Sequence, residues 1–136
     1  MKYVCEIENL TKAHPTDAGY DLRSIEDIEI PAHGSANINT GCCVEIPTGY
    51  VGLVKGRSGM TFKHNTEACN AGVIDSDYRG EIHVKIHNLN DVSFKVSKGD
   101  RIAQMLVIPC LIDNAERVDT LSDTVRGTNG FGSSGK

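Results

Sequence analysis

The sequence predicts an all-β fold, a jelly-roll-like barrel or sandwich with one short helix and a flexible, glycine-rich C-terminal tail. Apolar and polar residues alternate in many short runs, which is the pattern of strands with one buried face. Turn-forming residues interrupt these runs at short intervals, as is typical of sandwiches and barrels. At 136 residues the chain has room for one domain with a core and is too short for two.

The predicted strands follow one another along the whole chain. The alternating runs are residues 3–7, 28–30, 36–46, 81–87 and 92–96. Residues 102–108 form a nearly continuous apolar run, which is typical of a strand buried on both faces. Residues 58–69 have room for one short helix. We therefore expect one β domain over residues 1–125.

The C-terminal region combines a segment with conflicting patterns and a glycine-rich end. Ala115, Val118, Leu121 and Val125 fit a helical stripe, but the Asp and Thr residues around them are poor helix formers. We predict a strand and a connection there. Residues 126–136 are rich in glycine, with Phe131 as the only large apolar residue, so composition predicts a mobile end.

Cysteine use and charge limit the possible partners and compartment. Cys42 and Cys43 are neighbours in a predicted strand and point to opposite faces, so they are poorly placed to pair with each other. We interpret the five cysteines as small core residues of a protein in a reduced cytoplasm. The net charge of −4 without any run of Lys or Arg argues against a nucleic-acid partner, and no apolar run has membrane-spanning length.

Residues 72–81, GVIDSDYRGE, contain the most chemically capable group in the chain. Two aspartates, a tyrosine and an arginine lie between glycines, directly before the alternating run 81–87. A carboxylate, a ring and open backbone on a hairpin beside a rigid sheet suggest a small-molecule site. The alternative is an ordinary Asp-rich hairpin, which needs only one Gly and one Asp or Asn.

Four further segments give this hairpin a context. They are HPTDAGYDLRS (14–24), GRSGM (56–60), KGDRIAQ (98–104) and RGTNGFGSSG (126–135). Together with GVIDSDYRGE, and in this order, they closely resemble the five motifs of the trimeric deoxyuridine triphosphatases (dUTPases). The resemblance extends from His14 to the C-terminus.

The resemblance implies a magnesium-dependent dUTP diphosphatase. Water would attack the α-phosphorus of dUTP and yield dUMP and pyrophosphate, which limits uracil incorporation into DNA and supplies dUMP for thymidylate synthesis. It also implies a homotrimer whose active sites lie at subunit boundaries, each completed by a neighbour's tail. A dCTP deaminase of similar fold and a nucleotide-sensing regulatory protein that kept the pocket are the two alternatives.

The hairpin motif supplies the expected base and the uracil and sugar contacts. By resemblance Asp75 activates the water, and the bulk of Val73 and Ile74 beside it would limit solvent. Tyr78 would pack under the deoxyribose and exclude a 2′-hydroxyl. Backbone groups between Gly72 and His83 would bind uracil, although His83 also reads as a surface strand residue. Asn70 is the nearest match to an asparagine that the family places near the start of this hairpin.

The other motifs supply phosphate and metal contacts. Arg57, Ser58 and Gly59 match the phosphate-binding segment; a helix start capped by Ser58 is a compatible structural reading. Gln104 matches a glutamine of the phosphate and water shell, and Asp21 an aspartate that holds Mg²⁺ through water. Arg101 we interpret as structural.

The tail completes the expected site. Arg126 matches the γ-phosphate arginine and Phe131 the ring that stacks on uracil. The segment that wraps the phosphates corresponds to Gly132, Ser133 and Ser134. Asn129 stands where the family usually has glycine, and we expect the loop to survive because Asn tolerates the left-handed region.

Overall fold

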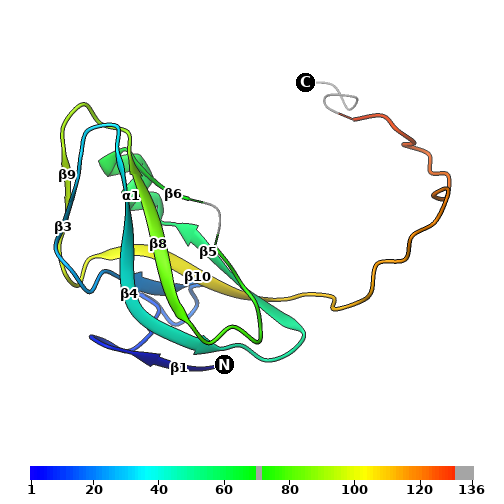
Figure 1. The fold of residues 1–136 in the computed structure, drawn as a ribbon, viewed down its shortest axis with the longest axis horizontal. Coiled ribbons are helices and arrows are strands. Elements are labelled where there is room, and N and C mark those ends of the chain that lie inside the picture. The colour runs from blue at the N-terminus through cyan, green and yellow to red at the C-terminus, as the bar shows by residue number, and fades with distance from the viewer. Residues whose placement is uncertain (70–71, 131–136) are drawn as a thin grey trace.

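The computed structural model describes residues 1–69 and 72–130, and their strands form two four-stranded antiparallel sheets and one two-stranded sheet (Figure 1). The first sheet has the order β1 (Lys2–Cys5), β4 (Ser35–Glu45), β8 (Glu81–Asn88), β6 (Thr66–Ala68). The second has the order β2 (Tyr20–Arg23), β10 (Arg101–Pro109), β5 (Tyr50–Gly56), β7 (Val73–Ile74). The small sheet pairs β3 (Ile28–Ile30) with β9 (Phe94–Val96), and the helix is α1 (Ser58–His64). The all-β prediction with one short helix is confirmed.

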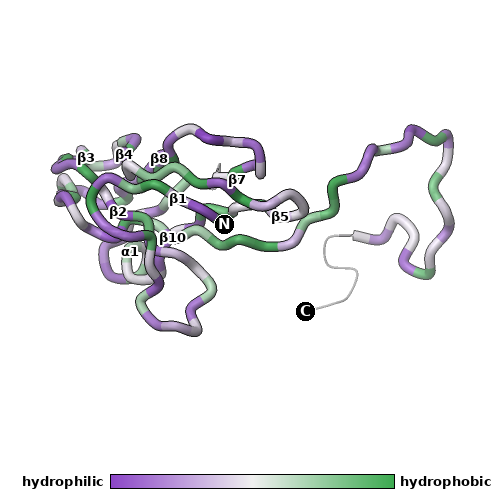
Figure 2. Tube along the Cα trace, turned by 90° about the horizontal axis from the view of Figure 1, so that it is seen from below, coloured by the Kyte–Doolittle hydropathy of each residue, from purple (hydrophilic) through white to green (hydrophobic). Residues whose placement is uncertain are grey.

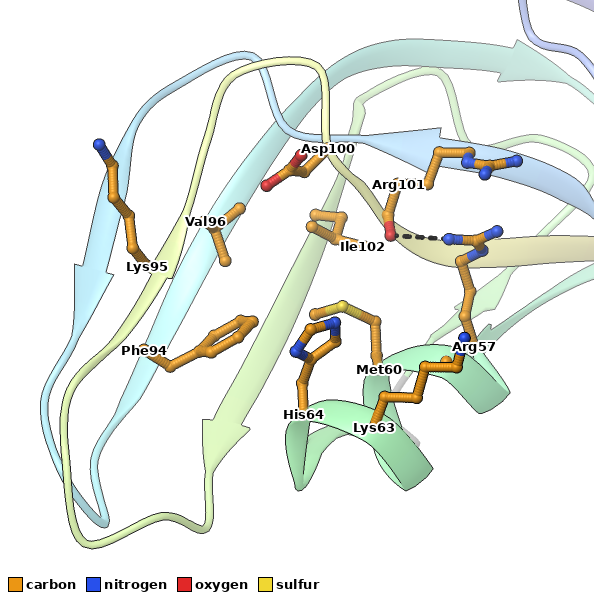
Figure 3. Close-up of a pocket in the computed structure, with 11 residues that line it drawn as sticks. Arg57, Met60, Lys63, His64, Phe94, Lys95, Val96, Asp100, Arg101 and Ile102 are labelled. Carbon is orange, nitrogen blue, oxygen red and sulfur yellow. Dashed lines mark hydrogen bonds between the residues drawn. The ribbon is translucent and has the colours of Figure 1, made fainter.

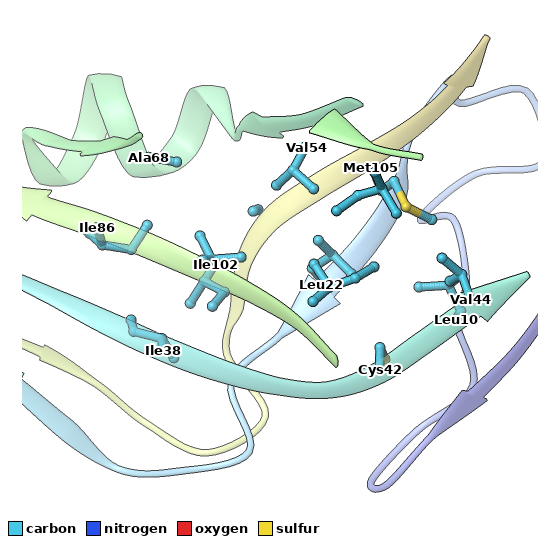
Figure 4. Packing of buried hydrophobic residues seen from close by; sticks show 14 of the residues in the cluster. Leu10, Leu22, Ile38, Cys42, Val44, Val54, Ala68, Ile86, Ile102 and Met105 are labelled. Carbon is cyan, nitrogen blue, oxygen red and sulfur yellow. The ribbon is translucent and has the colours of Figure 1, made fainter. Parts of the chain in front are cut away.

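The core lies between the two larger sheets (Figure 4). Ile82, Val84 and Ile86 of β8 are buried, as their alternation predicts, and the side chains of Ile102 and Met105 from β10 belong to the same cluster. The inward parity predicted for residues 36–46 also holds. It survives a register shift between β4 and β8 near Gly41, whose φ of 63° suits glycine.

Strand β10 corrects one prediction. Its first half is buried, with Ile102, Ala103 and Met105 at 0% exposure. Leu106 and Val107 are half-buried and Ile108 is exposed, so the expectation of burial on both faces is wrong for this end in the single chain. The run 92–96 is also shorter than predicted, since the strand begins at Phe94 and Val92 is exposed.

The cysteines differ from their predicted state. Cys42 is buried, as expected, but it forms a disulfide with Cys5, its direct cross-strand partner in the β1–β4 pair. The interpretation of all five cysteines as reduced core residues is therefore wrong. Cys42 and Cys43 do not pair with each other, as their strand geometry predicted, and Cys43 is a free, half-buried thiol. The disulfide attaches the mostly exposed strand β1 to the central strand β4.

Residues 110–130 form no strand or helix and run away from the sheets (Figure 1). The strand predicted in 115–125 is therefore absent from the described residues, and the whole segment is a connection. Apolar and polar residues alternate along it (Figure 2), and Leu111, Leu121 and Val125 are more than four-fifths exposed. The segment presents apolar side chains that no part of residues 1–69 and 72–130 covers.

A buried amide joins two loops near the small sheet. The side-chain nitrogen of Asn88, 1% exposed, donates to the carbonyl oxygens of Ile30, Pro31 and Val92 at 2.8–3.1 Å. Its side-chain oxygen accepts from the backbone and side chain of Asn90. All hydrogen-bonding capacity of this amide is used within the protein, which ties the end of β8 to the β3 turn.

We expect Asn88→Ala to destabilise the fold, because it leaves buried carbonyls without a donor, at about 1–3 kcal/mol for an unsatisfied buried group. Denaturant unfolding of the variant should show a lower midpoint. Asn37→Ala, on the exposed face of β4, is the matched control and should change stability by less than about 0.5 kcal/mol. Equal midpoints for the two variants would contradict the role assigned to Asn88.

Candidate active site

A cluster of three charged residues lies where β2, β10 and the start of α1 meet. The Nε of Arg57 is 3.1 Å from Asp21 Oδ1, and Nη1 of Arg101 is 3.3 Å from Asp21 Oδ2. Nη1 of Arg57 also donates to the backbone carbonyl of Arg101 at 3.1 Å. The Asp21 side chain is only 9% exposed, so both oxygens of a nearly buried carboxylate are paired with cations. The cluster carries a net charge of one positive unit.

Gln104 adjoins this cluster because it is the strand partner of Asp21 in the β2–β10 pair. Its amide nitrogen donates to the carbonyl of Gly56 at 3.1 Å. A Cβ atom on Gly19 would lie 2.7 Å from the Gln104 side-chain oxygen and 3.1 Å from the Gln104 Cβ, so a larger residue there would displace the Gln104 side chain. Sequence reasoning did not single out Gly19. Its position two residues before Asp21, within the motif of residues 14–24, could have indicated that Gly19 lies near the site.

The start of α1 presents the remaining residues of the predicted phosphate segment. Arg57 occupies the N-cap position and makes no side-chain cap, so the reading of Ser58 as the cap is wrong. Ser58 is instead the first helical residue. The first N–H groups of a helix lack partners within it and favour anions. Gly59 has open space where a Cβ would lie, which leaves the backbone accessible.

The two arginines of the cluster and the start of α1 border a cavity of about 570 Å³ (Figure 3). Arg57, Arg101 and Lys63 supply positive charge to its lining, and Asp100 supplies a carboxylate. The rings of His64 and Phe94 meet on the opposite side, with centroids 5.5 Å apart. A predominantly cationic cavity of this size suits an anionic ligand.

A second cavity, of about 240 Å³, lies at the segment 72–83. The residues that line it include Gly72, Val73, Ile74, Asp75, Tyr78 and His83, all of which the sequence analysis proposed for the site. The prediction of a hairpin is wrong, however. Strand β7 pairs with β5 and β8 pairs with β4 and β6, so the segment crosses between sheets and the two strands do not pair with each other.

The tyrosine and the aspartate of this cavity differ in how firmly they are held. The hydroxyl of Tyr78 donates to the carbonyl of Glu81 at 2.9 Å, and a Cβ on Gly80 would clash with that hydroxyl oxygen and with the Tyr78 ring. Gly80 therefore lets the ring close over the backbone. Asp75 is exposed and Val73 is 59% exposed, so the expected shielding of Asp75 by its apolar neighbours is wrong in the single chain.

The structure keeps the predicted site residues in separate groups. The cavity at Arg57 and the cavity at Asp75 share no lining residue. Arg126 lies in the segment 110–130, which has no strand or helix, and its Nε donates to the carbonyl of Asn129 at 2.9 Å. The predicted residues Asn70, Phe131, Gly132, Ser133 and Ser134 lie outside the described residues.

The turn that opens the first motif has a structural use of its own. The backbone N–H of His14 donates to the Asp17 carboxylate at 2.9 Å, which lowers the pKa of Asp17 below its ordinary value. Both side chains are exposed and stand apart from the two cavities.

The described residues contain no group of three or more His, Cys, Asp or Glu side chains that suits a metal ion. Asp21 offers a single carboxylate, and its two oxygens are already paired with arginines. Mg²⁺ keeps several waters and takes many of its direct ligands from substrate phosphates. Asp21 alone is therefore not a complete metal site, and a magnesium ion beside it would have to take its direct ligands from water and from a bound polyphosphate. In residues 1–69 and 72–130, no helix is long and apolar enough to cross a membrane.

Comparison with known proteins gives one consistent answer. The family model for dUTPase matches residues 6–135. The deoxyuridine 5′-triphosphate nucleotidohydrolase of Arabidopsis thaliana is 43% identical over 125 residues, covering 92% of this chain and 75% of the relative. The dUTPase of Staphylococcus bacteriophage 80alpha, solved with dUPNHPP, superposes with a TM-score of 0.92 at 30% identity and covers 99% of this chain and 98% of its own. A point mutant of the dUTPase from phage phi11 of S. aureus, whose structure reveals the coordination of a structural Mg(II) ion, has a TM-score of 0.77 at 27% identity, with coverage of 83% and 90%.

Proposed function

Because the chain belongs to the dUTPase family, we propose that it hydrolyses dUTP to dUMP and pyrophosphate. The geometry supports this reaction with two complementary cavities. One is cationic and lies beside a helix start, which suits a polyphosphate. The other combines a carboxylate, a tyrosine ring and the backbone of the segment that crosses from β7 to β8, which suits a nucleoside and an attacking water.

The separation of these two cavities is the observation that supports a shared site. A water-activating Asp75 must lie within hydrogen-bond reach of the reacting centre, whereas Arg57, a predicted phosphate ligand, borders a different cavity. Association of chains joins the two halves. We propose a homotrimer in which the Asp75 cavity of one chain faces the Arg57 cavity of another, and the tail of residues 126–136 closes over the resulting site.

In the proposed mechanism Asp75 accepts a proton from water as the water attacks the α-phosphorus. Arg57 and the N–H groups at the start of α1 stabilise the charge that develops on the phosphate oxygens. Gln104 orients the phosphates from β10. Mg²⁺, when bound to the triphosphate near Asp21, would screen the negative charge of the triphosphate.

The cytoplasmic location that the sequence suggested stays a prediction.

Pyrophosphate release from dUTP, dCTP, dTTP and UTP, measured side by side with Mg²⁺, tests the proposed function. We expect dUTP to have the highest kcat/KM, with the 5-methyl group of dTTP and the 2′-hydroxyl of UTP both disfavoured. Release of ammonia from dCTP, without pyrophosphate release from dUTP, would instead support the deaminase alternative. Tight dUTP binding without any turnover would support a nucleotide sensor.

Tyr78→Ala should raise UTP hydrolysis relative to dUTP, because it removes the ring that is expected to pack against the sugar. Steric rejection by a fitted apolar wall amounts to about 10–200-fold, so the dUTP/UTP ratio of kcat/KM should fall by up to that factor. Tyr78→Phe is the matched control. It loses only the hydrogen bond to Glu81 and should keep most of the discrimination. An unchanged ratio in the alanine variant would assign sugar selection to another residue.

A further inference from the structure

Strand β10 begins with an irregularity beside the charged cluster. Arg101 pairs with Arg23 of β2, but the next β2 residue, Leu22, pairs with Ala103, so one residue of β10 is extra at this point. Such bulges redirect side chains and are frequent next to active sites. Here the bulge surrounds Ile102, which is fully buried, while Arg101 on its N-terminal side stays partly exposed at the cavity.

The redirected residue contacts both partners of the phosphate cluster. Its guanidinium reaches Asp21 Oδ2 at 3.3 Å. Its carbonyl accepts a hydrogen bond from Arg57 Nη1 at 3.1 Å, which is the dashed line in Figure 3. Arg57 is thereby held at two of its five N–H donors, by Asp21 at Nε and by Arg101 at Nη1. Among the described residues the Arg57 guanidinium has no other hydrogen-bond partner, which leaves its remaining three N–H donors for an anion.

We propose that Arg101 is a positioning residue for the hydrolysis of dUTP, acting through Asp21 and Arg57. This inference rests on the proposed function. Asp21 is nearly buried, and a buried carboxylate needs compensating cations. With Arg101 present, each oxygen of Asp21 has its own arginine. Without Arg101, Arg57 is the one cation left beside Asp21. We expect the Arg57 guanidinium to rotate and bind both Asp21 oxygens in the bidentate geometry that arginine favours.

Loss of the Arg101 side chain would therefore withdraw Arg57 from the phosphates. The net charge of the Asp21, Arg57 and Arg101 side chains would also fall from one positive unit to zero. Arg101→Met keeps the length and apolar stem of the side chain and removes only its charge and donors. Because a misplaced group costs about 10²-fold, we expect kcat to fall by roughly 10- to 100-fold, with a smaller change in the affinity for a non-hydrolysable dUTP analogue.

A double-mutant comparison separates positioning from a general structural effect. If Arg101 acts through Arg57, Arg101→Met should lower kcat by less than about threefold in an Arg57→Met background, because coupled residues are not additive. Arg23→Met is the matched control. Arg23 is the strand partner of Arg101, binds Glu8 at 2.9 Å and the Gly99 carbonyl at 2.8 Å, and should leave kcat nearly unchanged.

The outcomes are distinct. Equal losses from Arg101→Met in the two backgrounds, or an Arg101→Met variant no slower than Arg23→Met, would overturn the inference. Arg101→Lys restores a point charge near Asp21 and should be faster than Arg101→Met. If the methionine variant does not fold, Arg101→Lys is used in its place, and its effect on kcat is compared in the wild-type and Arg57→Met backgrounds. Equal losses of kcat in the two backgrounds would again overturn the inference. A wild-type protein that does not turn over dUTP would overturn the proposed function itself, and this inference with it.

Discussion

Asp75→Asn is expected to keep nucleotide binding and to lose most of the turnover of dUTP. The amide has nearly the shape of the carboxylate but cannot accept the proton of the attacking water. General-base catalysis contributes about 10²–10⁴-fold, so kcat should fall by that factor while the affinity for a dUTP analogue changes little. Pyrophosphate release gives the first quantity and calorimetric titration the second.

Asp77→Asn is the control for this substitution. Asp77 lies two residues away on the same crossing segment and is also exposed, but it does not line the cavity. It should therefore retain turnover. Near-normal turnover in Asp75→Asn, or equal losses in the two variants, would place the base elsewhere.

Deletion of residues 126–136 is expected to leave a folded protein without useful turnover. Residues 111–130 contribute nothing to the buried core, and the segment is joined to the sheets at its start, where the Cys110 N–H donates to the Gly49 carbonyl at 2.9 Å. Circular dichroism and unfolding should thus be close to those of the full chain. Turnover should collapse through loss of Arg126 and Phe131, which are proposed to meet the γ-phosphate and the uracil.

Mixing the deleted chain with full-length Asp75→Asn tests where each tail acts. If a tail closes the site of another chain, mixed trimers contain sites with an intact Asp75 and an intact tail, and activity returns. The mixture should be compared with each variant alone after subunit exchange has been verified by mass spectrometry. Exchange without any recovery would show that each tail closes over its own chain.

The strands were predictable where one face alone is buried. On β8 the strict alternation of Ile82, Val84 and Ile86 with charged or polar residues leaves one orientation that buries apolar area. The crossing from β7 to β8 was not predictable in the same way. A short segment rich in Gly and Asp has the composition of a hairpin, and only the pairing of Val73 with Leu53 on β5 places β7 in the other sheet.

The site residues were predictable as motifs and not as contacts. The resemblance of their motifs selects Asp21, Arg57 and Gln104 as candidates one by one, but their proximity depends on the adjacency of β2, β10 and β5, strands distant in sequence. The proposed role of Arg101 depends on a bulge, which no pattern of apolar residues reveals. The disulfide between Cys5 and Cys42 likewise depends on the register of the β1–β4 pair, which places the two residues opposite each other. Distance along the sequence does not indicate this pairing, because Cys42 lies next to Cys43 in the chain.

The division of the site between two cavities has a consequence for enzyme dosage. If the site is shared between the chains of a trimer, as proposed, a single chain is inactive when it is alone, and catalytic capacity does not simply follow the number of chains made. By mass action, the share of chains in complete trimers rises with the square of the free-chain concentration while monomers predominate. Cells or viruses that make little of the protein would then obtain disproportionately little hydrolysis from each copy, and a modest rise in synthesis would have an amplified effect.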